Sequence, residues 1–202
     1  MPVRATSGTL PGWDDLFAQA QAQAGYFTTR EAAAHHIGTA LLTHHVKSGR
    51  VEHVGRGVFR FARFPPTPRE ELVPLWLWSE REGLFSHETA LSLYSLSDLA
   101  PTHVDMTLPS SRAKRRLKAP SPNLVMHFAD VPPAERGSWG PVPCTSLIRT
   151  LNDCAAAGTE SQYLAQAVRQ ALKAGQLLKT DRSQLVPELR RLVPPVSARK
   201  VR

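Results

Sequence analysis

Residues 26–61 read YFTTREAAAHHIGTALLTHHVKSGRVEHVGRGVFRF, and this stretch decides the fold of the N-terminal part of the chain. Its segments 30–36 and 40–47 contain alanine and leucine at helical spacing and predict two short helices separated by a turn. Thr29 and Thr39 stand in front of these segments, where a side-chain oxygen can cap a helix. The two predicted helices and their short turn are typical of a helix-turn-helix.

Segments on both sides of this motif complete a recognisable order. Residues 50–54 and 58–61 flank a glycine-containing turn and predict a β-hairpin. Apolar residues over 13–24 recur at helical spacing and predict one further helix in front. Three helices followed by a hairpin are typical of a winged helix-turn-helix domain.

The third predicted helix is the candidate DNA reader. Leu42 and Val46 lie four positions apart and should face the core. The opposite face then carries small or polar side chains that suit base edges and phosphates, namely Thr39, Ala40, Thr43, His44 and Lys47. The hairpin adds the basic residues Arg50, Arg56 and Arg60. We therefore expect double-stranded DNA as a partner, with a protein-interaction module or a plain three-helix packing unit as the alternatives.

The composition favours the same partner. Lys and Arg together number 25 against 17 Asp and Glu, which gives a net charge of +8. Such an excess favours a polyanion. No apolar run approaches the roughly 20 residues of a membrane span, and no secretory signal is recognisable at the N-terminus. We expect a soluble, cytoplasmic protein.

Prolines divide the chain at residues 64–68, which read FPPTP. Proline continues neither a helix nor a central strand, so this segment predicts a stiff linker. The expected organisation is a winged-helix domain over 1–64, a linker over 65–68, a C-terminal domain over 69–193 and a basic tail over 194–202. In the C-terminal domain, the pattern predicts helices near 69–81, 86–94, 145–156, 161–174 and 183–192, with strands at 104–108 and 123–128. The expected fold class is α+β.

Several candidate sites lie beyond the predicted linker. A basic run could be a second phosphate-contacting patch or a solvated loop, and it comprises Arg112, Lys114, Arg115, Arg116 and Lys118. Arg149 and Asp153 are spaced to form an ion pair along a helix, an interpretation that we favour over a functional surface.

The chain offers little for catalysis or for a cofactor. Ser86 and His87 are neighbours at a helix start and should diverge, so Ser86 is better explained as an N-cap than as a nucleophile. The paired histidines at 35–36 and 44–45 point apart on a helix and have no cysteine nearby. The two cysteines exclude a disulfide framework and a four-thiolate zinc site. We expect no enzyme, no metal and no cofactor.

Short motifs along the chain together resemble the AbiEi-type antitoxins. The N-terminal part contributes YFTTREAA (26–33), HVKSGR (45–50) and RGVFR (56–60). The C-terminal part contributes LFSHETAL (84–91), LSD (96–98), VPCTS (142–146) and RTLND (149–153). The resemblance covers roughly residues 13–190, and Phe59 departs from it because the family commonly has tyrosine there.

The resemblance implies an antitoxin of a type IV toxin–antitoxin, or abortive infection, system. Such a winged-helix transcriptional regulator binds repeats in its own promoter and represses the operon, with self-association on DNA. Its C-terminal domain assists cooperative binding and counters a nucleotidyltransferase-like toxin from the neighbouring gene without a stable complex. Candidate antitoxin-surface residues are Ser86, His87, Arg149 and Asp153. The alternatives are a stand-alone regulator with a ligand- or partner-sensing C-terminal domain, and a nucleic-acid enzyme.

Overall fold

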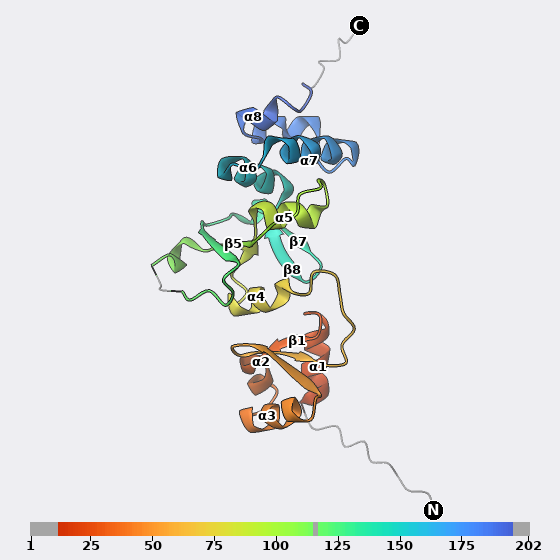
Figure 1. Ribbon diagram of the computed structural model, residues 1–202, viewed down its shortest axis with the longest axis vertical. Helices are drawn as coiled ribbons and strands as arrows, with labels where there is room; N and C mark the ends of the chain where they lie inside the picture. The colour runs from red at the N-terminus through yellow and green to blue at the C-terminus, as the bar shows by residue number, and fades with distance from the viewer. Residues whose placement is uncertain (1–11, 115–116, 196–202) are drawn as a thin grey trace, which may run out of the picture. The chain divides into compact units, whose positions relative to one another are not determined.

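The computed structural model describes residues 12–114 and 117–195 (Figure 1). The chain forms two compact units, Met1–Arg81 and Glu82–Arg202. Within the described residues, no helix combines the length and the apolar character that crossing a membrane requires. The fold is mixed α+β, as predicted, and each unit has its own core.

The first unit is a winged helix-turn-helix. Its elements are α1 (Trp13–Gln21), β1 (Tyr26–Thr28), α2 (Thr29–Ala34), α3 (Thr39–Lys47), β2 (Val51–Gly55), β3 (Val58–Phe61) and α4 (Leu72–Trp78). The hairpin β2–β3 is the predicted one, and β1 joins it in an antiparallel sheet of order β1-β3-β2. Apolar side chains from all three helices of the motif and from the sheet fill the core, including Leu16, Phe27, Ile37, Leu42 and Val51.

The two helices of the helix-turn-helix each begin one residue earlier than predicted. Thr28, and not Thr29, caps α2: its hydroxyl accepts a hydrogen bond from the Glu31 backbone, while the Glu31 carboxylate accepts one from the Thr28 backbone at 2.7 Å. This reciprocal capping box satisfies two backbone donors together, which a lone threonine cannot do. Gly38, and not Thr39, stands at the N-cap of α3.

The predicted linker over residues 65–68 lies inside the first unit, which extends to Arg81. Charged pairs tie the segment after the prolines back to the winged helix. The Glu70 carboxylate lies 3.0 Å from the Arg60 guanidinium. Arg81 donates hydrogen bonds to the Glu31 carboxylate and to the Gln23 side chain, the latter at 2.6 Å. The prolines follow β3, which ends at Phe61, but they do not end the unit, because the residues beyond them supply the partners of its buried charges.

The second unit places a cluster of helices against a mixed sheet. Its strands are β4 (Leu84–Phe85), β5 (Val104–Leu108), β6 (Leu124–Phe128), β7 (Arg136–Trp139) and β8 (Val142–Thr145). Its α-helices are α5 (His87–Tyr94), α6 (Leu147–Ala157), α7 (Ser161–Lys173) and α8 (Pro187–Arg190). The strand order is β6-β5-β4-β8-β7. Figure 1 shows α6, α7 and α8 gathered beside α5, and Leu91, Leu151 and Val168 are among the apolar side chains buried between them.

The second unit departs from the sequence prediction in three places. The short strands β4, β7 and β8 were not predicted. In place of the predicted helix over 183–192, the structure has a 3-10 helix, Lys179–Gln184, and then the short α8. The two are separate because Pro187 begins a new helix. Ser86 stands at the N-cap of α5, but its side chain makes no capping hydrogen bond.

Candidate nucleic-acid interface

Helix α3 exposes the predicted face. Leu42 and His45 are buried, and Leu41 and Val46 pack partly against the core. The side chains predicted to read DNA are all exposed, namely Thr39, Ala40, Thr43, His44 and Lys47. Thr43 donates its hydroxyl hydrogen to the Thr39 backbone carbonyl at 2.9 Å. The helix therefore presents a continuous face of small, polar and basic groups, with no acidic residue on it.

The two histidines of α3 have different roles. The ring of His45 stacks on Trp13 at a centroid distance of 4.2 Å, and neither of its nitrogens has a hydrogen-bond partner. Burial, together with the nearby charge of Arg50, lowers the pKa of His45 below its ordinary value. His45 is thus a neutral core residue, while His44 belongs to the exposed face. Pairing in sequence does not make these histidines a common site.

The wing, which is the hairpin formed by β2 and β3, carries one of the predicted arginines at its tip. Arg56 is exposed in the turn between β2 and β3, and Arg50 is exposed just before β2. The backbone amide of Thr29 donates to the Gly57 carbonyl at 2.9 Å, which fixes the wing against the start of α2. Arg56 can therefore reach a phosphate from a defined position.

Arg60 is not part of this surface, and the prediction that it contacts DNA is wrong. Its side chain is buried in β3, where the guanidinium bonds the Glu70 carboxylate at 3.0 Å and the Phe64 carbonyl at 3.1 Å. The guanidinium also lies over the ring of Tyr26. Strand alternation alone does not reveal this placement, because every residue of β3 is buried.

A further arginine, which the sequence analysis did not single out, joins the surface. Arg30 is exposed in the first turn of α2. Together with Arg56 it lines a hollow of about 370 Å³ between α2, the wing and α4. In the sequence, the feature that could have identified Arg30 is a basic residue in the helix that precedes α3.

The predicted basic patch of the second unit includes one residue that is not on the surface. Arg112 is buried, and its guanidinium donates to the Glu82 carboxylate at 2.6 Å, so its assignment to a phosphate-contacting surface is wrong. Lys114 and Lys118 are exposed. Arg115 and Arg116 lie outside the described residues.

The four candidate antitoxin-surface residues have different environments. Ser86 is fully buried, which contradicts its assignment to a surface. His87 is half-buried. The Arg149 guanidinium bonds both carboxylate oxygens of Asp153, at 2.8 and 2.9 Å, and also bonds Glu135 at 2.6 Å. The favoured interpretation, an ion pair along the helix, is confirmed and is extended by a second carboxylate.

Ser86 and His87 do approach each other, contrary to the sequence argument that they diverge. The Ser86 hydroxyl oxygen lies 3.0 Å from Nδ1 of His87. The backbone of His87 has a φ of 50°, in the left-handed region, and not the helical value on which the expected divergence rested. Because the hydroxyl is fully buried, a substrate cannot reach it as a nucleophile.

Fold and surface together define a winged helix-turn-helix in which α3 has an exposed, polar face and the tip of the wing is basic. Residues 14–62 match the family model described as a transcriptional regulator, AbiEi antitoxin. This match agrees with the resemblance found in the sequence, and the description of the family is that of a transcriptional regulator.

The fold of the chain as a whole is also similar to a solved structure. The RV2827C protein from Mycobacterium tuberculosis is 14% identical to this chain, with a TM-score of 0.50, and the similarity covers 91% of this chain and 72% of that one. At this identity the likeness concerns the fold alone. No match was found among curated proteins.

Proposed function

We propose that the chain is a DNA-binding antitoxin that represses its own toxin–antitoxin operon and counteracts a nucleotidyltransferase-like toxin without a stable complex. The observation that carries the proposal is the exposed face of α3, within a segment matching the AbiEi antitoxin regulators. Since its partner is promoter DNA, the protein acts in the cytoplasm. Catalysis is not part of the proposal, because the Ser86 hydroxyl is buried.

The dimensions of α3 suit the major groove. Its 9 residues extend about 14 Å, and the groove is about 12 Å wide. Thr39, Ala40 and Thr43 can approach base edges closely because they are small, and His44 adds a ring nitrogen. Lys47 can contact a phosphate or a guanine. Specificity then comes from α3.

Exposed arginines around α3 would fix its position on the duplex. Arg56 at the wing tip, Arg50 before β2 and Arg30 on α2 are all exposed. Contacts from such residues to phosphates set the register of a protein on DNA and are weakened by salt. Lys114 and Lys118 of the second unit would add affinity without sequence preference.

A binding experiment tests the DNA part of the proposal. The full chain is titrated with its own promoter duplex and with a shuffled duplex over a range of salt concentrations, using fluorescence anisotropy. Lys47→Ala and Arg56→Ala should each weaken promoter binding and lower the salt slope by about one. Arg169→Ala, at an exposed position on α7, is the matched control and should change neither. Unchanged binding in both test variants would exclude α3 and the wing as the interface.

A growth experiment tests the antitoxin part. The neighbouring gene is expressed alone and then with the full chain, and growth is followed. We expect toxicity and its rescue. A harmless neighbour, or a toxic neighbour without rescue, would refute the antitoxin role and leave the DNA-binding role standing.

One observation favours a second function, a stand-alone regulator whose C-terminal unit senses a ligand or partner. The family match ends at residue 62, so the second unit lies outside it. A small molecule or protein that changes promoter binding, together with a harmless neighbouring gene, would support this alternative.

A further inference from the structure

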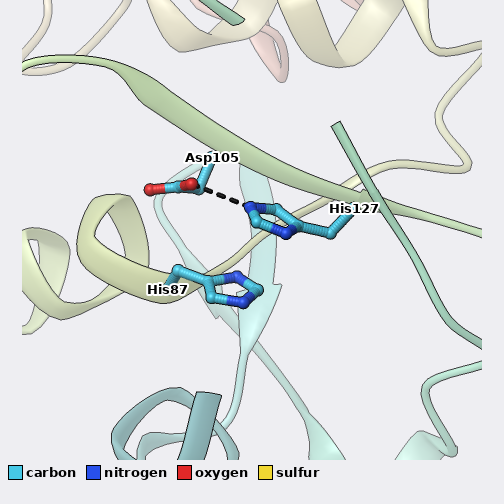
Figure 2. Close-up of side chains that lie close together, drawn as sticks. All are labelled: His87, Asp105 and His127. Carbon is cyan, nitrogen blue, oxygen red and sulfur yellow. Dashed lines mark hydrogen bonds and ion pairs between the residues drawn. The ribbon is translucent and has the colours of Figure 1, made fainter. Parts of the chain in front are cut away.

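Three side chains from separate elements converge in the second unit. His87 at the start of α5, Asp105 on β5 and His127 on β6 bring one ligand atom each within 4.8 Å of one another (Figure 2). Among residues 12–114 and 117–195, this is the one group of three such side chains that meets this distance. None of its members takes part in the proposed DNA contact.

The sheet sets this convergence. Strands β5 and β6 are parallel neighbours, with Asp105 opposite Val125 and Thr107 opposite His127. The Asp105 side chain is 3% exposed, and its Oδ1 forms a hydrogen bond with Nε2 of His127 at 2.8 Å. Nε2 of His103 lies 3.2 Å from the same oxygen. The histidine rings of positions 87 and 127 stack at a centroid distance of 3.7 Å.

The second carboxylate oxygen of Asp105 has no partner. Oδ2 is buried and makes no hydrogen bond. A buried carboxylate with an unsatisfied oxygen is costly unless a positive charge or a donor compensates it. A cation bound beside Asp105 would supply that compensation.

The surroundings of His87 prepare its ring to be a ligand. The fully buried hydroxyl oxygen of Ser86 lies 3.0 Å from Nδ1 of His87 and accepts a hydrogen bond from Thr107 at 2.8 Å. With Thr107 already donating, Ser86 can accept the Nδ1 hydrogen of His87, which leaves Nε2 free of a proton.

We propose that the second unit binds one divalent transition-metal ion, Zn²⁺ in the first instance, through Asp105, Nε2 of His87 and Nε2 of His127. Nitrogen and carboxylate ligands of Zn²⁺ lie about 2.0–2.2 Å from the metal, so tetrahedral ligand atoms are about 3.3 Å apart. The ligand atoms of the present group, which lie within 4.8 Å of one another, would have to draw closer by side-chain rotation to reach this spacing. The metal then replaces the hydrogen bond between His127 and Asp105. The fourth position is left to water or to His103. Binding links β5, β6 and α5.

The test uses the full chain stripped of metal with a chelator. Zn²⁺ is titrated by calorimetry, and Co²⁺ is added separately so that visible absorption reports tetrahedral nitrogen and oxygen ligands. We expect one ion per chain and a thermal midpoint that rises with Zn²⁺ concentration. His127→Gln should weaken Zn²⁺ binding at least about 100-fold, since losing a ligand costs more than losing a supporting residue. Ser86→Ala removes the hydroxyl beside His87 but no ligand, and it should weaken Zn²⁺ binding about 10- to 100-fold.

His53→Gln is the matched control, because His53 is an exposed histidine on β2. It should leave Zn²⁺ binding unchanged. No binding by the wild-type chain would overturn the proposal, and so would binding that survives His127→Gln or is lost in His53→Gln. Circular dichroism confirms that each variant is folded. If His127→Gln does not fold, the wild-type Co²⁺ spectrum decides, and the absence of tetrahedral bands overturns the site.

Discussion

The two units place their polar side chains in opposite ways. On α3 the polar residues are close in sequence, exposed and without a shared partner. In the second unit His87, Asp105 and His127 are distant in sequence, buried or half-buried, and in mutual contact. An exposed helical face follows from periodicity alone, whereas a buried polar group needs the whole sheet to assemble it. The first arrangement suits a ligand as large as a duplex, and the second suits a ligand as small as an ion.

The first unit also contains a buried polar network, which is an exception to the difference between the two units. Glu31 accepts hydrogen bonds from Gln19, Gln23, Arg81 and the Thr28 backbone. Glu31→Ala removes the capping box and leaves the Arg81 guanidinium without this partner, so we expect a loss of about 3 kcal/mol in the free energy of unfolding. Urea denaturation followed by circular dichroism measures it.

Glu71→Ala serves as the comparison for that experiment. The Glu71 carboxylate is 62% exposed and lies 4.0 Å from Arg69, so its removal should change stability by less than about 0.5 kcal/mol. Equal effects of the two variants would show that the Glu31 network contributes nothing beyond an ordinary surface charge.

Arginines 56 and 60 sharpen the contrast within a single hairpin. Arg60→Ala removes a buried ion pair with Glu70 and should lower the free energy of unfolding by about 2 kcal/mol. Arg56→Ala should leave stability within about 0.5 kcal/mol and weaken DNA binding instead. Urea denaturation of both variants measures their stability, and fluorescence anisotropy measures their binding to DNA. A stability loss at Arg56 that matches the one at Arg60 would remove the distinction.

The pH dependence of stability tests whether His45 belongs to the core. Its pKa is lower in the folded chain than the ordinary 6.5, so the unfolded chain takes up the proton first as the pH falls. The contribution that neutral His45 makes to the free energy of unfolding is complete above pH 6.5 and is lost progressively below it. His45→Phe keeps an aromatic ring against Trp13 and should flatten the decline, although His87 still contributes. Denaturation between pH 5 and pH 8 measures the slope, and an unchanged slope would contradict a buried, neutral His45.

The smallest expected effect concerns the exposed lysines of the second unit. The double variant Lys114→Ala/Lys118→Ala should lower affinity for promoter and shuffled duplexes alike, by about threefold, since phosphate contacts carry no base preference. Anisotropy with both duplexes checks this. A loss confined to the promoter would place these lysines at base edges, and no loss would leave them as solvated surface.

Local patterns were enough for most of the first unit. Helical periodicity predicts the buried position of Leu42 and the exposed positions of Thr43 and Lys47, and glycine predicts the turn of the wing. The predicted start of α2 is one residue late because Thr28 and Thr29 are equally good caps in isolation. Only the reciprocal bond with Glu31 selects Thr28.

Long-range contacts explain what the sequence did not reveal. Arg60 and Arg112 look like free basic residues until Glu70 and Glu82 are placed beside them. Strands β4, β7 and β8 have only two to four residues each and form because neighbouring strands pair with them. His127 carries no local signal, because its meeting with Asp105 depends on the register of two parallel strands.

Arg81 has a consequence for exchanging DNA-binding specificity between regulators of this kind. It closes the first unit and contacts Glu31, far upstream in the chain. A graft cut after the prolines would carry every residue that we propose to face bases. It would nevertheless leave the Glu31 carboxylate without Arg81 and the Arg60 guanidinium without Glu70. A chimera joined after Arg81 keeps both charges matched, so the transferable cassette is residues 1–81.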